Sequence, residues 1–456
     1  MGEMYTLYKG RICPLQTFAK DFTTKLTGKA TYEGLSSEQV LSGFIFYYSD
    51  WAPILDEVSP KRQKESRALV EMLLSGRSLK LFPVADSTGT FGWYAQNDDL
   101  PMTVSDDEYI FIRKHLSYCQ ELVVKGDFAA LEKVFEKIKL FQEKRAADVL
   151  PSPTRVKAER LYNALTTGRW LAMLTLTLGI LLFAYSLWKK GSEGEVKKGI
   201  CPPHSSFITH HSSFLTHHSS LITLYLLLLT SYLLLIFILR WIAGGHIPMA
   251  GGFDSMNLMA IAIGILGLVF SFRSKKFSIF NFQFSISAAM LSMGFCLLVA
   301  MMSGSNPPVT NLMPVLSSPL LCLHVAVIMM SYALFFFLMM IGIAGLISGK
   351  KTLNFQISIF NLAKRLLYPA VFLLTLGIII GALWANISWG NYWTWDPKEV
   401  WALITLIVYA FPLHPSLSVS REPKKFFLYC TLAFLSVIIT YFGVNILLGG
   451  MHSYGG

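Results

Sequence analysis

Residues 320–347 read LLCLHVAVIMMSYALFFFLMMIGIAGLI and carry no Asp, Glu, Lys or Arg. An α-helix needs about 20 consecutive apolar residues to cross a bilayer, so this stretch predicts a transmembrane helix. Seven other apolar runs lie at residues 170–188, 221–242, 256–272, 282–302, 367–388, 399–413 and 426–448. The sequence therefore predicts an all-α polytopic membrane protein with about eight transmembrane helices.

With 53% hydrophobic residues, the chain is too apolar for an ordinary soluble enzyme.

The basic residues are distributed unevenly among the segments that connect the apolar runs. From residue 189 onward, fourteen of the sixteen Lys and Arg lie in four alternate connections, at residues 189–198, 273–276, 350–365 and 421–425. Arg240 and Lys398 are the exceptions. Basic loops stay in the cytoplasm, so residues 1–169, the other connections and the C-terminus are expected on the outer face. The net charge of +11 thus reflects topology and gives no argument for nucleic acid binding.

The chain is expected to have three parts. Residues 1–155 predict a mainly helical extracytoplasmic domain, residues 156–218 hold the first transmembrane helix and a His-rich linker, and residues 219–456 form the main transmembrane domain. No apolar signal sequence opens the chain. We therefore expect that the first span drives export of the domain before it, or that the sequence lacks an N-terminal membrane portion.

Local motifs predict several elements within the first part. Helices are expected to begin at Ser36, at Ser59-Pro60, at Ser105 and at Asp127. The segments LKLFPV and FGWYA predict a small hairpin.

Cysteine and histidine spacing leaves two questions open. Cys13 and Cys119 could form a disulfide in an oxidising compartment, although their spacing does not establish one. Residues 204–224 contain the seven-residue repeat HSSFITH, HSSFLTH, HSSLITL, whose five histidines could bind a metal. A regular period predicts no fixed ligand geometry, so we favour an expanded repeat in a cytoplasmic connection.

The tryptophan loop, residues 384–401, reads WANISWGNYWTWDPKEVW and lies between two apolar runs. A lone Trp at a membrane interface needs no function. Several rings together form an aromatic ledge, and such a ledge suits a flat amphiphilic ligand such as a porphyrin. The candidate ring residues are Trp384, Trp389, Tyr392, Trp393, Trp395 and Trp401.

Two polar residues of the loop are further candidates. Asp396 is expected to cap the helix that Pro397 begins, and it could also hydrogen-bond a ligand or its imidazole partner. Lys398 could pair with a propionate.

Four of the five histidines outside the repeat lie near membrane boundaries. His324 and His452 are both expected at the outer face, level with the tryptophan loop. Either one alone could be an interfacial residue satisfied by a carbonyl. As a pair beside an aromatic ledge, they predict two axial ligands of a haem iron. His414 lies at the inner end of its run, where it could belong to a second haem site or be an ordinary interfacial residue, and His246 lies in a glycine-rich outer connection.

These motifs resemble those of a known family. WGNYWTWDPKEVWALITLIVYA is similar to the WWD signature of haem-handling proteins, in the form found in CcsA/ResC-type cytochrome c biogenesis proteins. GHIPMAGGFDSM, the LHV at His324, the VYA…LH before residue 415 and the GVN…GMHSYG terminus follow in the family's order. The resemblance covers residues 220–456, and GRICPLQTFAKDF…LSSEQVLSGF is similar to the outer domain of fused CcsBA-type synthases.

The resemblance implies a system II holocytochrome c synthase, of the haem-lyase type, in a bacterial cytoplasmic (inner) membrane. Such a protein moves haem b to an outer platform and attaches it to the CxxCH motifs of apocytochrome c. By motif match, His324 and His452 correspond to the outer axial pair and His414 to the inner-site histidine. The platform residues are Trp389, Trp393, Trp395 and Asp396.

The resemblance also implies partners: apocytochrome c, a ResB/CcsB-like membrane subunit, thiol-reducing proteins and the lipid bilayer. Fused family members carry further N-terminal spans with a second inner-site histidine. The sequence shows none, so we expect either that a separate ResB-like subunit supplies this histidine or that the chain is a fragment.

Two rival functions stay open on the sequence. One is a haem exporter or chaperone that hands haem to a separate ligation protein. The other is a structural membrane subunit whose aromatic residues only anchor it. Covalent haem on a co-expressed apocytochrome would separate the synthase from the exporter, and a missing Soret band would exclude the haem-ligand assignment.

Overall fold

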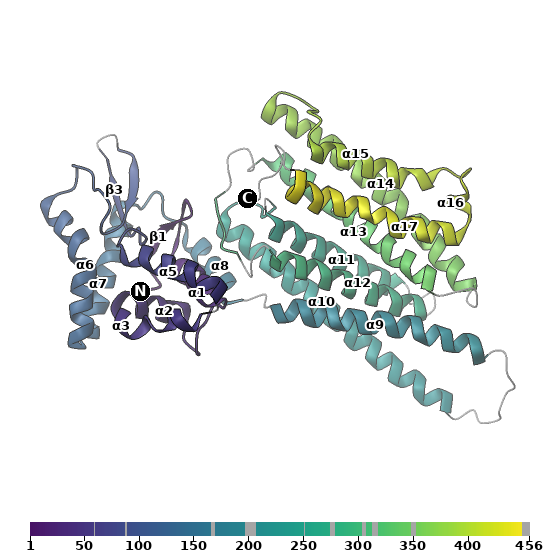
Figure 1. The fold of residues 1–456 in the computed structure, drawn as a ribbon, viewed down its shortest axis with the longest axis horizontal. Helices are drawn as coiled ribbons and strands as arrows, with labels where there is room; N and C mark the ends of the chain where they lie inside the picture. Colours follow the sequence, from purple (N-terminus) through teal and green to yellow (C-terminus); the bar gives the residue numbers. More distant parts are fainter. Residues whose placement is uncertain are drawn as a thin grey trace. The chain divides into compact units, whose positions relative to one another are not determined.

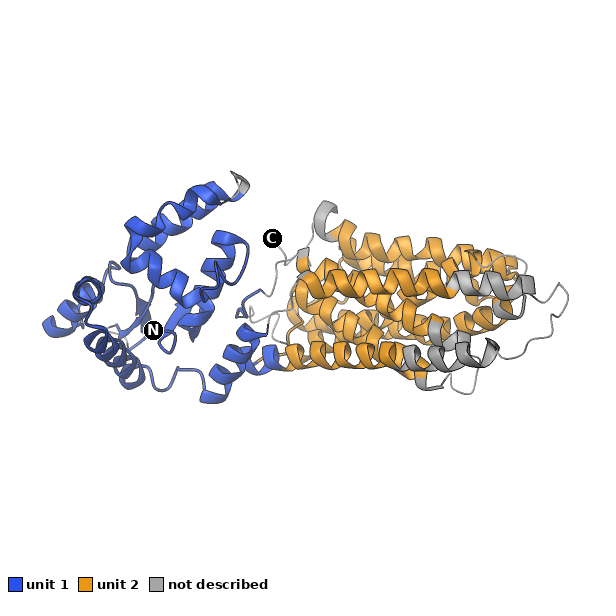
Figure 2. Cartoon of the chain, turned by 90° about the horizontal axis from the view of Figure 1, so that it is seen from below, with its two compact units in different colours: residues 1–166, 239–245, 307–311 blue, residues 167–238, 246–306, 312–456 orange. Residues whose placement is uncertain are grey.

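The computed structural model describes residues 1–58, 60–86, 89–165, 169–196, 207–249, 251–273, 279–302, 307–311, 318–347 and 353–448. The chain forms two compact units (Figures 1 and 2). Unit 1 comprises Met1–Thr166, Leu239–Gly245 and Pro307–Asn311, and unit 2 comprises Thr167–Ile238, His246–Asn306 and Leu312–Gly456. Both units are mainly helical, which confirms the predicted fold class.

Unit 1 contains two short antiparallel hairpins and a set of helices. The strands are β1 (Tyr5–Tyr8) with β2 (Arg11–Pro14), and β3 (Phe82–Ala85) with β4 (Phe91–Tyr94). The helices are α1 (Leu15–Thr27), α2 (Ser37–Phe46), α3 (Tyr48–Trp51), α4 (Ile54–Glu57), α5 (Pro60–Leu74), α6 (Asp106–Lys125), α7 (Phe128–Arg145) and α8 (Pro153–Ala164). The predicted β3–β4 hairpin and the predicted helices α2, α5, α6 and α7 are confirmed.

Side chains at the helix starts explain why these helices begin where they do. The Ser36 side chain accepts the backbone N–H of Gln39, whose side chain accepts the backbone N–H of Ser36. This capping box satisfies two N–H groups that a helix start leaves without partners. Ser105 and Asp127 cap α6 and α7 by accepting a backbone N–H three residues further on.

The β1–β2 hairpin was not predicted. Its two-residue turn is Lys9-Gly10, and both residues have positive φ, at 50° and 74°. Such a turn matches the twist of two antiparallel strands, and Asn-Gly or Asp-Gly is its usual sequence. Because Lys9 occupies the first turn position in place of Asn or Asp, the sequence did not predict this hairpin.

Unit 2 is built from helices, most of them long. They are α9 (Arg169–Val196), α10 (Phe207–Gly244), α11 (Gly252–Arg273), α12 (Ile279–Met302), α13 (Pro319–Ile347), α14 (Leu353–Trp389), α15 (Pro397–Ala410), the 3-10 turn η4 (Phe411–Leu413), α16 (Ser418–Arg421), α17 (Pro423–Ile438) and the π-helix η5 (Ile439–Leu448). Side chains of the His-rich repeat before residue 221 lie outside the described part of the chain.

Within the described residues, six helices are long and apolar enough to cross a membrane. They are Leu221–Gly244, Gly252–Ser271, Phe284–Met301, Pro319–Ile347, Gln356–Trp389 and Pro423–Val444. The other two expected spans are shorter: the apolar segment Trp170–Ser186 within α9, and α15, which has 14 residues. The chain is a multi-pass membrane protein.

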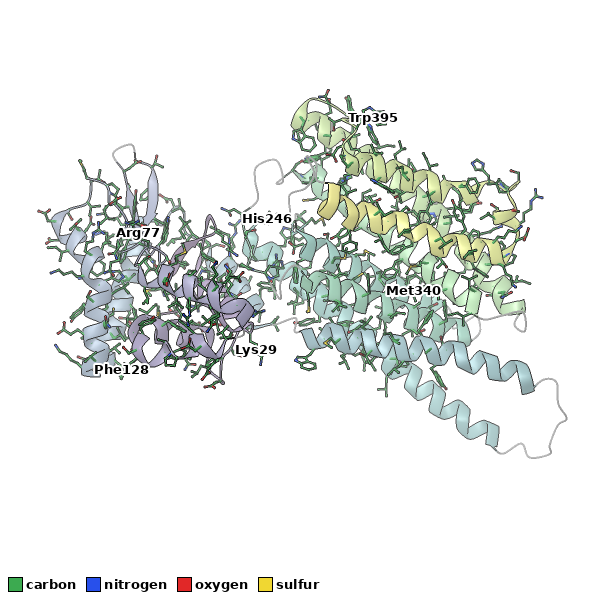
Figure 3. All side chains as sticks on the ribbon, viewed as in Figure 1. Lys29, Arg77, Phe128, His246, Met340 and Trp395 are labelled. Atoms are coloured by element: carbon green, nitrogen blue, oxygen red, sulfur yellow. The ribbon has the colours of Figure 1, made fainter. Side chains whose placement is uncertain are left out.

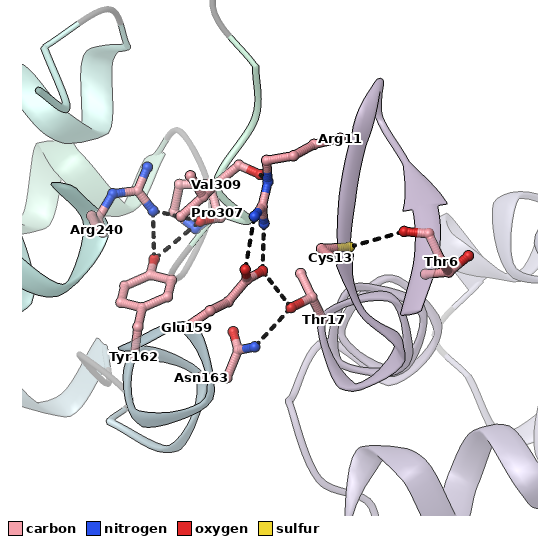
Figure 4. Close-up of polar contacts among 10 residues, drawn as sticks. All are labelled: Thr6, Arg11, Cys13, Thr17, Glu159, Tyr162, Asn163, Arg240, Pro307 and Val309. Carbon is pink, nitrogen blue, oxygen red and sulfur yellow. Dashed lines mark hydrogen bonds and ion pairs between the residues drawn. The ribbon is translucent and has the colours of Figure 1, made fainter. Parts of the chain in front are cut away.

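A buried ion pair joins β2 to α8 inside unit 1 (Figure 4). Arg11 and Glu159, 8% and 1% exposed, form two hydrogen bonds, and Nη1 of Arg11 lies 2.7 Å from the carboxylate. Thr17 donates to the same carboxylate at 2.6 Å. Because an unpaired buried charge is costly, these contacts fix β2 and α1 against α8.

Arg240, one of the two exceptions in the charge pattern, is buried in unit 1 with 6% exposure. It lies near the end of α10 and donates to Tyr162 of α8 and to the carbonyl of Pro307 (Figure 4). The exception therefore has a local cause, since this cation is held by partners within a folded unit.

All cysteines in the described residues are free and buried: Cys13, Cys119, Cys296, Cys322 and Cys430. The disulfide considered between Cys13 and Cys119 does not form in this structure. Burial raises the pKa of the Cys13 thiol to about 12 and that of Cys119 to about 11. Both are therefore unreactive thiols at neutral pH.

Candidate ligand site at the tryptophan loop

The tryptophan loop begins on the last turns of α14. Trp384 is 2% exposed and meets Trp389 edge to face, with ring centroids 4.8 Å apart and an interplanar angle of 70°. Gly390 ends the helix with φ of 79°, and its N–H donates to Asn386 at 2.8 Å. A glycine in this left-handed conformation is a common helix terminator. The first two rings are thus anchored to a helix.

The middle of the loop exposes its rings. Tyr392 and Trp395 are 57% and 71% exposed, and Trp395 is labelled in Figure 3. Trp393 meets Trp395 edge to face at 6.0 Å. Adjacent exposed large aromatic rings mark interaction surfaces, so the predicted ledge has a buried part on α14 and an exposed part in the loop.

Trp395 has φ of 58°, which is unusual for a residue other than glycine. A left-handed conformation costs an L-residue roughly 1–2 kcal/mol. The next residue, Asp396, is 7% exposed and caps α15 by accepting the N–H of Lys398 at 2.9 Å, and Pro397 is the first helical residue. The capping predicted for Asp396 is confirmed.

Glu399 organises the loop, and sequence reasoning did not single it out. Its carboxylate accepts the N–H of Thr394 at 2.8 Å and the N–H of Asp396 at 3.3 Å. It completes a capping box with Asp396. The signal was present in the spacing Asp-Pro-Lys-Glu, because an acidic residue three positions after the cap is the mark of that motif.

Trp401 lies one turn into α15, and its carbonyl accepts the Thr440 hydroxyl at 3.2 Å. Thr440 also bonds to the Thr405 hydroxyl at 3.0 Å. These contacts connect α15 to the π-helix η5.

His324 lies in the second turn of α13 and is half-buried against α14. Its Nδ1 is 2.7 Å from the carbonyl oxygen of Gly377. A carbonyl can only accept, so Nδ1 carries the hydrogen. The ring lies against Gly381, which is one helical turn before Trp384. The structure therefore brings His324 to the helix end that carries the first rings of the loop.

His452 lies outside the described residues. The π-helix η5 leads toward it and ends at Leu448. Tyr441 of this helix shares a hydrogen bond of 3.1 Å with Ser255 of α11. Long π-helical segments are rare and occur often at functional sites.

His414 is not brought to His324. It is exposed and follows η4 at the end of α15 that is opposite to the tryptophan loop. The helix α15 and the turn η4 separate the tryptophan loop from His414. At a rise of 1.5 Å per residue, they extend for about 25 Å. His246 follows α10 and makes a long contact of 3.4 Å with its neighbour's carbonyl (Figure 3).

His115 is a core residue of unit 1. His115 is 4% exposed, its Nδ1 bonds to Ile112 at 2.8 Å, and its ring packs on Phe82. Burial lowers the pKa of His115 to about 4, so it is a neutral core residue. No group of three or more His, Cys, Asp or Glu among the described residues could hold a metal.

The fold defines a multi-pass helical membrane protein, and the tryptophan loop with His324 is its candidate ligand site. The family model described as cytochrome C assembly protein matches residues 249–452. The chain is 33% identical to the cytochrome c biogenesis protein CcsA of Nymphaea alba over 258 residues, which cover 48% of this chain and 81% of that protein. It is 33% identical to CcsA of Prochlorococcus marinus over 257 residues, which cover 48% and 79%. The chain belongs to the CcsA family of cytochrome c biogenesis proteins.

A further relative aligns along nearly the whole chain. Protein NrfI of Wolinella succinogenes is 29% identical over 530 aligned positions, which cover 99% of this chain and 54% of NrfI. The chain thus spans about half the length of this relative. The likeness to NrfI includes residues 1–166, which the family model does not match.

Proposed function

We propose that this chain binds haem b as a substrate at the tryptophan loop and delivers it for thioether attachment to apocytochrome c. In this proposal His324 and His452 bind the iron, and His414 belongs to a second, inner site. Trp389, Trp393, Trp395 and Asp396 form the platform. Trp384, Tyr392 and Trp401 are its further contacts. Membership of the CcsA family supports haem handling.

The observation that carries the proposal is the setting of His324. Its imidazole donates through Nδ1 to a backbone carbonyl, so iron binding falls to Nε2. Histidine ligands of metals usually have such a partner, which fixes the tautomer and the ring orientation. Aromatic rings lie one turn away on α14. The described residues therefore fit a haem group.

The residues would act by binding and orienting. Haem bound as substrate supplies two vinyl groups and an iron with two axial positions. The rings of the loop would cover an apolar porphyrin face and exclude water. The two imidazoles would occupy the iron until the histidine of a CxxCH motif replaces one of them. Each cysteine thiol adds across one vinyl double bond, with sulfur on one carbon and the hydrogen on the other, so that no net electrons are transferred.

The proposal also covers location and partners. We assign the chain to a bacterial inner membrane, with residues 1–155, the tryptophan loop and the C-terminus on the outer side, because the basic connections favour the cytoplasm. Residues 219–456 would be the haem-handling part, and residues 156–218 would link the two. A ResB/CcsB-like membrane subunit would be a partner, and thiol-reducing proteins would keep the CxxCH cysteines reduced.

Purification in detergent tests the haem site. We expect a Soret band that is reduced in His324→Ala and His452→Ala, while His246→Ala retains it. Co-expression with an apocytochrome should give covalent haem that survives acid-acetone extraction. A Soret band without covalent haem would favour the exporter. A missing band, or one unchanged in both variants, would reject the haem-ligand assignment.

A further inference from the structure

The imidazole of His324 on α13 can approach the backbone of α14 because position 381 is a glycine and has no side chain. In an α-helix, the carbonyl of Gly377 accepts the N–H of the residue four positions later, which is Gly381. The imidazole of His324 is a second donor to that oxygen, at 2.7 Å. A carbonyl has two lone pairs and can accept both bonds.

Gly381 makes the second bond sterically possible. Side chains of a helix lean toward its N-terminus, so the side chain at position 381 would cover the carbonyl at position 377. A Cβ added to Gly381 would lie 2.6 Å from Cε1 and 2.7 Å from Nδ1 of His324. Real Cβ atoms do not make such contacts, so the ring would have to move and the hydrogen bond would break.

Gly377 has a different neighbour. A Cβ added there would lie 2.5 Å from Cδ1 of Ile328, one turn further along α13. The two glycines are four residues apart on the same face of α14, a spacing that also lets membrane helices pack closely. Ser331 reinforces this helix pair by donating to Ala370 at 2.8 Å. Close packing alone would thus need both glycines equally, whereas orientation of the imidazole needs Gly381 specifically.

We propose that Gly381 is a positioning residue for haem binding, and this inference rests on the proposed role of His324. The absence of a side chain at Gly381 exposes the Gly377 carbonyl. That carbonyl then fixes the His324 tautomer with hydrogen on Nδ1 and directs Nε2 to the iron. The hydrogen bond also makes the imidazole a stronger electron donor, which stabilises ferric iron.

The test compares Gly381→Ala with Gly345→Ala in the full chain, purified in detergent. Gly345 lies on α13 and does not contact His324, and a Cβ added there would lie 2.4 Å from Cδ2 of Phe427 on α17. Both variants therefore introduce one methyl group between two packed helices with a similar overlap. We expect Gly381→Ala to weaken haem retention about tenfold and to raise the reduction potential of the bound haem. Gly345→Ala should retain a wild-type Soret band and potential. Melting of the haem-free variants shows whether each one folds.

A double variant separates positioning from packing. If Gly381 acts through the imidazole, Gly381→Ala should lower haem retention no further in a His324→Ala background. Equal losses in Gly381→Ala and Gly345→Ala, or additive losses in the double variant, would overturn the inference in favour of packing. A wild-type spectrum and potential in Gly381→Ala would overturn it as well. A different result would reject the proposed function, namely a Soret band that is unchanged in His324→Ala.

Discussion

Arg240 donates to the hydroxyl of Tyr162 at 2.7 Å, and its guanidinium lies 5.1 Å from the centre of the same ring. The hydroxyl in turn donates to the carbonyl of Pro307 at 3.0 Å. Arg240 and Pro307 come from the part of the sequence that builds the transmembrane helices, yet both belong to unit 1. Tyr162 therefore links three separate chain segments.

Tyr162→Phe should destabilise unit 1 while keeping the ring and its contact with the cation. A lost hydrogen bond to a buried charged group costs about 1–3 kcal/mol. Chemical unfolding of the full chain, followed by alkylation of buried Cys13, measures the change. Tyr118→Phe is the control, because Tyr118 is 48% exposed and its loss should change stability by less than about 0.5 kcal/mol. Equal effects of the two variants would contradict the link.

The stability of unit 1 should fall at acidic pH because of His115. Burial lowers its pKa to about 4, whereas an unfolded imidazole titrates near about 6.5. Between these values the unfolded chain binds a proton that the folded chain does not. The contribution of His115 is therefore complete above about pH 6.5 and is lost as the pH falls toward 4, by about 3 kcal/mol in total.

His115→Phe removes the titration and keeps a ring against Phe82. Unfolding by denaturant at a series of pH values, read with a dithiodipyridine that reacts with exposed Cys13 at acidic pH, should show a flatter pH dependence for this variant between pH 4 and 6.5. A variant curve that runs parallel to the wild-type curve would show that His115 is not the group responsible.

The sequence predicted those features that depend on neighbouring residues. Apolar runs gave the long helices, and Ser36, Ser105 and Asp396 marked helix starts, since a cap acts within three or four positions. Contacts between distant positions were not predictable. Nothing local shows that Arg240 is buried beside Tyr162. Nor does the sequence show that His324 meets Gly377, because 53 positions separate them and only the packing of two helices joins them.

Glu399→Ala should disorder the tryptophan loop. The substitution removes the acceptor of the Thr394 and Asp396 backbone N–H groups, and loss of a helix cap costs about 0.5–2 kcal/mol. We expect a red shift of tryptophan emission and weaker haem retention. Glu422→Ala is the control, because Glu422 lies at the start of a different helix, α17, is 54% exposed and pairs with Lys425. Wild-type emission and haem retention in Glu399→Ala would refute this role.

Substitutions of Trp395 should separate backbone strain from ligand binding. Glycine adopts the left-handed conformation without penalty, whereas alanine does not. In the absence of haem, Trp395→Gly should therefore be more stable than Trp395→Ala by about 1 kcal/mol. Both variants lack the ring, so both should retain less haem than the wild type. If alanine proves as stable as glycine, the loop does not hold residue 395 at positive φ.

Tyr409→Phe tests the interior of unit 2, where α15 stacks on α13. The ring of Tyr409 lies 3.6 Å from that of Phe335 at an angle of 12°, and its buried hydroxyl finds no hydrogen-bond partner among the described residues. An unsatisfied buried hydroxyl is unfavourable, and its removal is neutral or stabilising. The variant should melt in detergent at the wild-type temperature or above it and keep its Soret band. Tyr409→Leu, which loses the stack as well, should melt lower. A lower melting temperature for Tyr409→Phe would mean that the hydroxyl is bonded in the folded protein.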